Sequence, residues 1–288
     1  MFKFIFDLIV IYLTIAVAYS TLHAVVTHLI LLMETRLAYW QDPSVVRPSG
    51  LLLCRNAVLE ILCNISRWVL LPFSGFQANP NPIEGAEDPP ESPILLIHGY
   101  GQNQTDWYWF QYQLKQAGLG PVYTINLWNM LGGIEAHADK VAKRLRNIQA
   151  KHPNCPITLI GHSMGGLIAS YYAEILNKNN EDVSLKKIIA IGSPFYGTKL
   201  AGLGTGLSVE QMAPNASFLE SLRGKIENSS IPYFYIASQM DNTIVPWDSA
   251  LIDPLTPDAE NQTIIPDIGH LRLLISPKVI DKVKVWLH

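Results

Sequence analysis

The chain has 288 residues, of which 49% are hydrophobic and only 16% are charged, whereas charged residues make up about 25% of a typical globular domain. This composition disfavours intrinsic disorder and coiled-coil arrays. The formal net charge is -3, and no cluster of basic residues occurs, so nucleic acid is not expected as a partner. The three cysteines, Cys54, Cys63 and Cys155, are too few and too scattered for a disulfide framework or a four-ligand zinc site.

The first apolar segment predicts a transmembrane helix over about residues 8–33. No Asp, Glu, Lys or Arg occurs between Leu8 and Met33, and about 20 apolar residues suffice to cross a bilayer. Two alternatives stay open: a signal peptide cleaved after Ala18, which would leave a secreted protein, and a buried core helix. Asp7 and the length of the run favour a single-pass membrane anchor. The few flanking charges do not decide which side of the membrane the rest of the chain occupies.

A second helix is predicted over about residues 51–71. Its four polar residues lie on one narrow stripe and the rest of its circumference is apolar; they are Asn56, Glu60, Asn64 and Arg67. Such a helix needs cover, which either the membrane interface or a globular domain could supply. Both helices belong to an N-terminal region, residues 1–75, and the proline-rich polar stretch 76–93 after it is predicted to be a linker.

After the linker, short apolar runs alternate with amphipathic segments. This alternation predicts an α/β domain over residues 94–288, with a mostly parallel central sheet of about six strands and helices on both faces. The expected strands are residues 94–98, 122–126, 157–161, 187–192, 233–238 and 262–266. The expected helices are residues 105–117, 134–151, 164–178 and 277–287.

The strongest chemical motif lies between the third expected strand and the helix after it. Residues 161–165 read Gly-His-Ser-Met-Gly, a G-x-S-x-G pentapeptide at the position where a sharp turn exposes a serine. The serine stands at a helix N-terminus, where the free N–H groups favour a developing negative charge. Ser163 is therefore the candidate nucleophile.

A serine hydroxyl needs a base, and in this arrangement an acid and then a histidine follow the serine along the chain. Asp241 comes just after the expected strand 233–238, and His270 lies between the last expected strand and the last helix. We assign these two residues as the orienting acid and the base. The competing acids in the same region are Asp248, Asp253, Asp258 and Asp267.

An oxyanion hole needs two N–H donors, usually one from the residue after the nucleophile and one from a loop after an early strand. Met164 and Tyr100 fit these positions. His98 and His162 stand beside the two oxyanion segments, so a structural role is expected for them, because the base must approach the serine from another loop.

These motifs resemble those of the α/β-hydrolases, and in particular the bacterial triacylglycerol lipases and related carboxylesterases. The resemblance covers about residues 91–288 and lies in the segments 98–101, 161–166, 192–198, 212–219, 241–246 and 269–271. Phe195 stands where that group often has a histidine, and the first 90 residues match nothing in the secreted lipases. The resemblance implies an α/β-hydrolase fold with a short lid-like insertion.

Two apolar segments have open interpretations. The insertion at about 197–230 is either a mobile lid or a connecting helix over the sheet. The aromatic run 107–110 lines an acyl pocket, marks a membrane-facing rim or, the interpretation we favour slightly, packs in the core.

The function expected from these residues is a serine ester hydrolase, a lipase or carboxylesterase acting on lipid-like esters through Ser163, Asp241 and His270. This chemistry requires no metal and no other cofactor. The expected partners are a lipid or other acyl-ester substrate and a membrane, and the oligomeric state is not predicted. Thioesterase, phospholipase or acyltransferase activity is an alternative for the same triad, and a noncatalytic membrane-tethered binding module is a less favoured one.

Overall fold

A computed structural model describes residues 2–42, 47–75, 92–178, 183–253, 256 and 259–288. A single six-stranded sheet forms its centre, with the strand order β2-β1-β3-β4-β5-β6, and all neighbouring strands are parallel. The strands are β1 (Ile94–Ile97), β2 (Val122–Ile125), β3 (Ile157–His162), β4 (Leu185–Ile191), β5 (Tyr233–Ser238) and β6 (Gln262–Ile265). The predicted parallel α/β sheet is confirmed, with strand ends within two residues of those expected.

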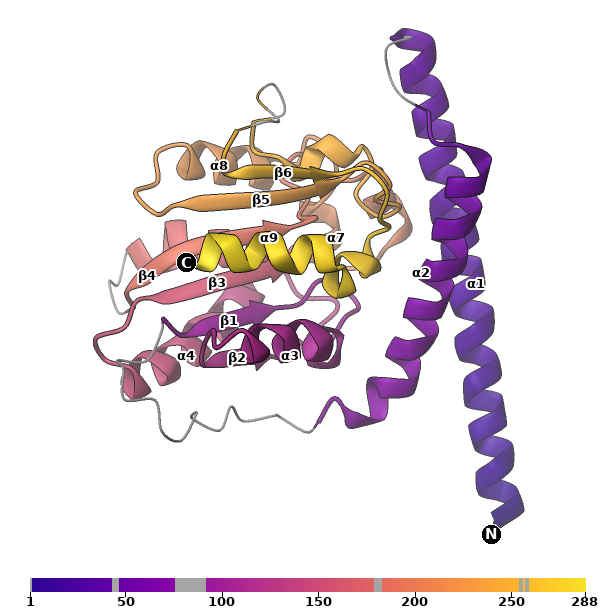
Figure 1. Cartoon of the computed structure of the whole chain (residues 1–288), viewed down its shortest axis with the longest axis horizontal. Coiled ribbons are helices and arrows are strands. Elements are labelled where there is room, and N and C mark those ends of the chain that lie inside the picture. Colours follow the sequence, from indigo (N-terminus) through magenta and orange to yellow (C-terminus); the bar gives the residue numbers. More distant parts are fainter. Residues whose placement is uncertain (1, 43–46, 76–91, 179–182, 254–255, 257–258) are drawn as a thin grey trace.

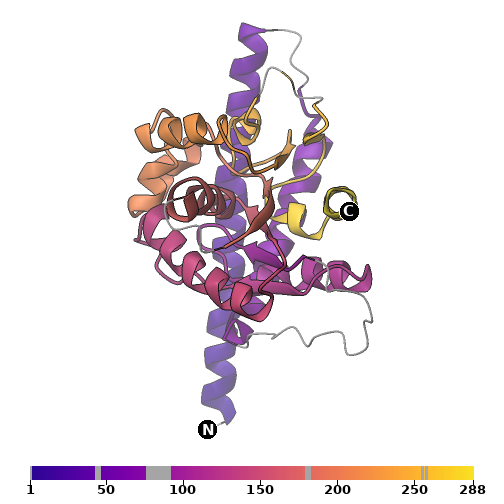
Figure 2. The same cartoon turned by 90° about the vertical axis from the view of Figure 1, so that its left-hand side faces the viewer.

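Helices cover both faces of the sheet (Figure 2). On one face, α4 (Ile134–Lys151), α5 (Met164–Tyr171) and α8 (Ser217–Ile226) enclose the larger apolar core. On the other face, α3 (Tyr108–Gln116) and α9 (Pro277–Leu287) cover a second core. Because both faces are covered, the central strands are apolar on both sides, which explains their continuous hydrophobic runs.

The two N-terminal helices lie side by side along the carboxyl ends of the strands (Figure 1). α1 (Phe2–Gln41) is longer than the predicted span, and α2 (Gly50–Leu70) matches its prediction. Most of the predicted linker, residues 76–91, falls outside the described residues. In open parallel sheets, ligands bind in a crevice outside the carboxyl ends of the strands. In this protein, α1 and α2 cover that end of the sheet.

The polar stripe of α2 faces the hydrolase-like unit, residues 94–288. Asn56, Glu60 and Asn64 are buried, whereas the apolar side chains on the other side of the helix are exposed. Those exposed side chains are Leu51, Val58, Leu62 and Val69. The globular unit thus covers the polar stripe, whereas the exposed apolar side is still open to cover by a membrane interface.

α1 has two different faces. Its inner face is buried and consists mainly of small or weakly polar residues at helical spacing, namely Ala16, Ser20, Ala24, Thr27 and Leu31. Apolar side chains are exposed on the outer face over nearly the whole length of the helix. Among the described residues, α1 alone is long and apolar enough to cross a membrane, which makes it a candidate membrane segment.

The insertion at 197–230 divides into two parts. A 3-10 helix (Lys199–Leu203) and α7 (Leu207–Gln211) lie over the carboxyl end of the sheet, where Val209 of α7 reaches the larger core. α8 packs into this core through three residues, Leu219, Leu222 and Ile226. The second part is therefore a connecting helix, and only the first part is in a lid-like position. In the aromatic run, Trp107 and Phe110 are fully buried in the second core, as favoured, whereas Trp109 is 47% exposed. The interpretation of the run as core packing is therefore confirmed for these two residues only.

Candidate active site

Ser163 occupies a strained turn between β3 and α5. Its φ of 57° and ψ of -130° lie outside the ordinary regions for a non-glycine residue. The flanking glycines allow strand and helix to approach closely: a Cβ on Gly161 would lie 2.3 Å from the amide nitrogen of Gly166, and one on Gly165 would lie 2.1 Å from the carbonyl oxygen of Ile97. The glycines of the motif are thus required by space, and the turn exposes the serine to a cavity.

Asp241 and His270 form a buried pair. The Nδ1 atom of His270 lies 2.7 Å from Oδ2 of Asp241, and both side chains are nearly inaccessible to solvent. The other oxygen of Asp241, Oδ1, accepts hydrogen bonds from the backbone N–H groups of Thr243 (2.8 Å) and Ile244 (2.7 Å). These two bonds fix the plane of the carboxylate, which in turn orients the imidazole.

Among the competing acids, Asp267 lies in a different environment. Asp267 forms ion pairs with Lys278 at 3.0 Å and with Arg55 at 3.6 Å, and about a third of its side chain is exposed. The bond to Lys278 holds the pKa of the Asp267 carboxyl below its usual value. Asp258 falls outside the described residues.

Ser163 and His270 line one cavity, together with Tyr100 and Met164. In the part of the chain that the structure describes, the Ser163 hydroxyl and the His270 ring form no hydrogen bond with each other. Catalytic hydrogen bonds of this kind are often long or poorly aligned until substrate binds. Met164 is the first residue of α5, so its N–H has no acceptor within the helix. Tyr100 belongs to the loop after β1, hereafter the oxyanion loop, residues 99–103.

The oxyanion loop packs directly against Ser163. A Cβ on Gly99 would lie 2.6 Å from Cβ of Ser163, and the Gly99 N–H donates to Oε1 of Gln102 at 2.6 Å. Of the five site residues expected from the sequence, four line this cavity, and the fifth, Asp241, contacts His270. The five residues come from four separate parts of the chain.

His98 and His162 have the contacts of structural residues. Nε2 of His98 accepts a hydrogen bond from the N–H of Leu127 at 2.9 Å, and burial lowers the pKa of His98 to about 4. The ring of His162 lies between Oε1 of Gln102 (2.9 Å) and the carbonyl oxygen of His270 (3.2 Å), and burial, with His270 nearby, holds its pKa well below the usual value. Burial therefore disfavours the charged form of both rings.

The cavity has a volume of about 750 Å³, which is in the range of small-molecule and cofactor sites. Its walls include Leu22 and Val26 of α1, Trp68 of α2, and Leu203 and Val209 of the insertion. The N-terminal helices thus form part of the cavity, which the sequence analysis did not predict. No cluster of metal-ligating side chains occurs among the described residues.

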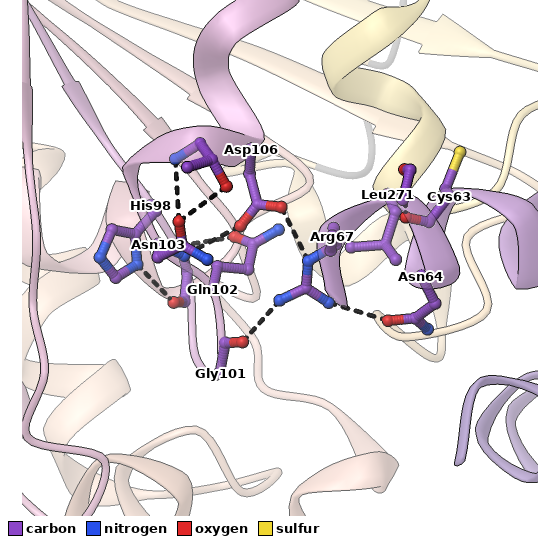
Figure 3. A network of polar contacts seen from close by, with 12 residues as sticks. Cys63, Asn64, Arg67, His98, Gly101, Gln102, Asn103, Asp106 and Leu271 are labelled. Atoms are coloured by element: carbon purple, nitrogen blue, oxygen red, sulfur yellow. Dashed lines mark hydrogen bonds and ion pairs between the residues drawn. The ribbon is translucent and has the colours of Figure 1, made fainter. Parts of the chain in front are cut away.

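Two further polar residues reach the active-site loops from α2. Glu60 accepts hydrogen bonds from the residues after His270, and Arg67 contacts the oxyanion loop (Figure 3). The sequence analysis placed both residues on the polar stripe but gave neither a role in the site. A stripe of buried polar residues on an otherwise apolar helix was the available signal.

The fold, the strained turn at Ser163 and the buried Asp241–His270 pair are together those of an α/β-hydrolase. A model of the alpha/beta hydrolase family matches residues 94–278, and the chain belongs to this family.

Curated relatives include a triacylglycerol lipase from Pseudomonas fragi, 26% identical over 145 residues, a match that covers 46% of this chain and 48% of the relative. A triacylglycerol lipase from Pseudarthrobacter phenanthrenivorans is 27% identical over 117 residues, covering 38% of this chain and 35% of the relative. The chain therefore spans half or less of the length of these relatives.

Solved structures show the same fold. The mature form of a Bacillus licheniformis lipase superposes with a TM-score of 0.60 at 16% identity, covering 74% of this chain and 98% of that one. Aspergillus fumigatus lipase B gives a TM-score of 0.54 at 21% identity, covering 66% of this chain and 51% of that one.

Proposed function

We propose that this protein is a serine ester hydrolase of the lipase and carboxylesterase type. Ser163 attacks the acyl carbon, His270 takes the serine proton and passes it to the leaving alcohol, and Asp241 orients the imidazole and stabilises its charged form. The N–H groups of Tyr100 and Met164 stabilise the oxyanion. His270 then activates a water molecule that releases the acyl group from Ser163.

The observation that carries this proposal is the buried His270–Asp241 pair, with its 2.7 Å contact, whose histidine lines the same cavity as the strained Ser163. Strain at a turn and burial of a carboxylate both cost stability, so a site that combines them is a candidate for catalysis. The direct test is labelling of the protein by a fluorophosphonate probe, followed by hydrolysis of p-nitrophenyl esters. Parallel assays with thioester, phospholipid and acyl-acceptor substrates separate ester hydrolysis from the related activities. A protein that does not react with the probe would be a noncatalytic binding module.

The proposed substrates are esters with long apolar acyl groups, a class suggested by the lipase relatives and by the largely apolar cavity wall. Each methylene that the wall buries contributes roughly 0.8 kcal/mol. We therefore expect kcat/KM to rise from acetyl toward medium-chain p-nitrophenyl esters and to level off when the cavity is full. A steady fall from acetyl to octanoyl esters would assign the protein to the small-ester esterases, while the proposed triad would stand.

The proposed localisation is a membrane, with α1 as the anchor. The exposed outer face of α1 is apolar over most of its length, and lipid is the environment in which such a surface is stable. Residues on both sides of the possible signal cleavage site, Ala16 and Ser20, are buried against the rest of the protein, which supports retention of the segment. Substrates dissolved in the bilayer would then be close to the cavity that α1 helps to form.

We expect the full-length protein to remain with membranes after alkaline carbonate extraction, and the double substitution Leu13→Glu and Val17→Glu on the outer face of α1 to release much of it, because each charge is costly to bury in lipid. Both residues are exposed, as is Val285 on α9, so Val285→Glu is the matched control and should have no effect. Intact wild-type protein in the soluble fraction contradicts the anchor, and a mature chain that begins at Tyr19 identifies a cleaved signal peptide. In sealed vesicles, a tag at the N-terminus lies on the opposite side from the hydrolase unit only if α1 crosses the bilayer.

A further inference from the structure

The polar stripe of α2 contacts two loops of the candidate active site. The two loops come from distant parts of the chain: the oxyanion loop follows β1, and the His270 segment precedes α9. Glu60 and Arg67 are seven residues apart on α2, so they share one face of the helix at a separation of two turns. One helix therefore contacts the backbone next to both the base and the oxyanion donor of the proposed mechanism.

Glu60 holds the segment that carries His270. Its Oε2 accepts the N–H of Leu271 and its Oε1 accepts the N–H of Arg272, both at 3.1 Å. These are the first N–H groups of the 3-10 helix Leu271–Ile275, which have no acceptor within that helix, so the carboxylate acts as its cap. A Cβ on Gly269 would lie 2.5 Å from Oε1 of Glu60, which shows how closely the carboxylate approaches the backbone next to His270.

Arg67 holds the oxyanion loop (Figure 3). Its Nη2 donates to the carbonyl oxygen of Gly101 at 2.5 Å, and its Nε donates to Oδ1 of Asp106 at 2.7 Å. Oδ2 of Asp106 in turn accepts the N–H of Asn103 at 2.9 Å. The guanidinium group therefore fixes the loop from Gly101 to Asn103, directly after Tyr100, and Nη1 of Arg67 donates to Asn64 of its own helix at 3.0 Å.

Simple packing of α2 does not require these groups. Burial raises the pKa of Glu60 to about 6, which reflects the cost of placing a carboxylate where solvent cannot reach it. An apolar residue would attach the helix to the domain at a lower cost in desolvation free energy, because buried charged groups contribute little net stability even when they are paired. What the polar groups provide is defined geometry at two backbone segments that the proposed chemistry depends on.

From these contacts we infer that Glu60 and Arg67 are positioning residues: Glu60 sets the position of His270, and Arg67 sets the position of the oxyanion loop. This inference rests on the proposed function of Ser163, Asp241 and His270. Neither residue is proposed to react with the substrate. The N-terminal region is then part of the catalytic unit and not only an anchor.

The test compares full-length variants Glu60→Gln, Glu60→Ala and Arg67→Lys with Leu62→Ala, a change on the exposed side of the same helix. Displacement of a catalytic group by about 1 Å can cost on the order of 100-fold in rate. We therefore expect kcat to fall about 100-fold in Glu60→Ala and roughly 10-fold in the milder Glu60→Gln and Arg67→Lys, with KM for a medium-chain ester nearly unchanged. Leu62→Ala should keep the wild-type values.

A second measurement separates positioning from a general loss of structure. A trifluoromethyl ketone with a medium-length chain forms a hemiketal oxyanion with an active serine, whereas the corresponding alcohol only fills the cavity. The inference requires that Arg67→Lys weakens binding of the ketone about 10-fold and leaves binding of the alcohol unchanged. The inference is overturned if binding of both ligands is weakened equally, or if kcat is that of the wild type in both Glu60→Gln and Arg67→Lys. If Glu60→Ala does not fold, these two mild substitutions decide the question. If Ser163→Ala also keeps its turnover, the proposed function itself is wrong, so the two failures are distinguishable.

Discussion

Replacement of Ser163 by alanine is expected to abolish ester turnover, with a loss of about 10⁴-fold or more in kcat, because no other group in the mechanism can form the acyl-enzyme. At 1.36 kcal/mol for each factor of ten, this corresponds to at least about 5.4 kcal/mol of transition-state stabilisation. The fold should be unaffected, since alanine keeps the Cβ atom that packs near Gly99.

The measurement is kcat/KM with a medium-chain p-nitrophenyl ester, together with fluorophosphonate labelling and a thermal unfolding curve. Ser170→Ala is the matched control, because this serine is buried on the same helix, α5, and its hydroxyl donates to the carbonyl oxygen of Gly166. It should retain its activity. Wild-type turnover in Ser163→Ala would falsify the assignment of the nucleophile.

The substitution Asp241→Asn is expected to lower kcat about 10⁴-fold, because an amide favours the wrong tautomer of the histidine ring and does not stabilise the imidazolium. The effect should be large here because the 2.7 Å contact between Asp241 and His270 is buried. The two backbone N–H groups that bind Oδ1 would still hold the amide oxygen, so the side chain should keep its position.

The matched control is Asp267→Asn, which removes a carboxylate three residues from His270 that pairs with Lys278 and Arg55 on the surface. Steady-state kinetics should show little change for this variant and for Asp248→Asn. If Asp267→Asn is the variant that loses activity, Asp241 is the wrong acid and the buried pair is only structural.

Local patterns in the sequence were enough to predict the hydrolase unit. The alternation of apolar runs and amphipathic segments predicted all six strands, because strands covered on both faces must be apolar on both sides. The strand-turn-helix context of Ser163 predicted its strained turn, since a G-x-S-x-G segment between a strand and a helix forms a sharp turn with the serine in a strained backbone conformation. Asp241 and His270 could be selected because each follows a strand end, and the ends of parallel strands meet at one edge of the sheet.

The arrangement of the N-terminal helices depended on tertiary structure. Hydropathy identified α1 and α2 as helices but did not reveal that they cover the cavity, because an apolar helix can be buried equally well by lipid or by protein. The polar stripe of α2 required a partner, and only the folded chain brings Glu60 to the backbone beside His270 and Arg67 to the oxyanion loop, across separations of 211 and 34 residues. Helical periodicity determines which side chains share a face, whereas contacts between distant segments depend on how the whole chain packs.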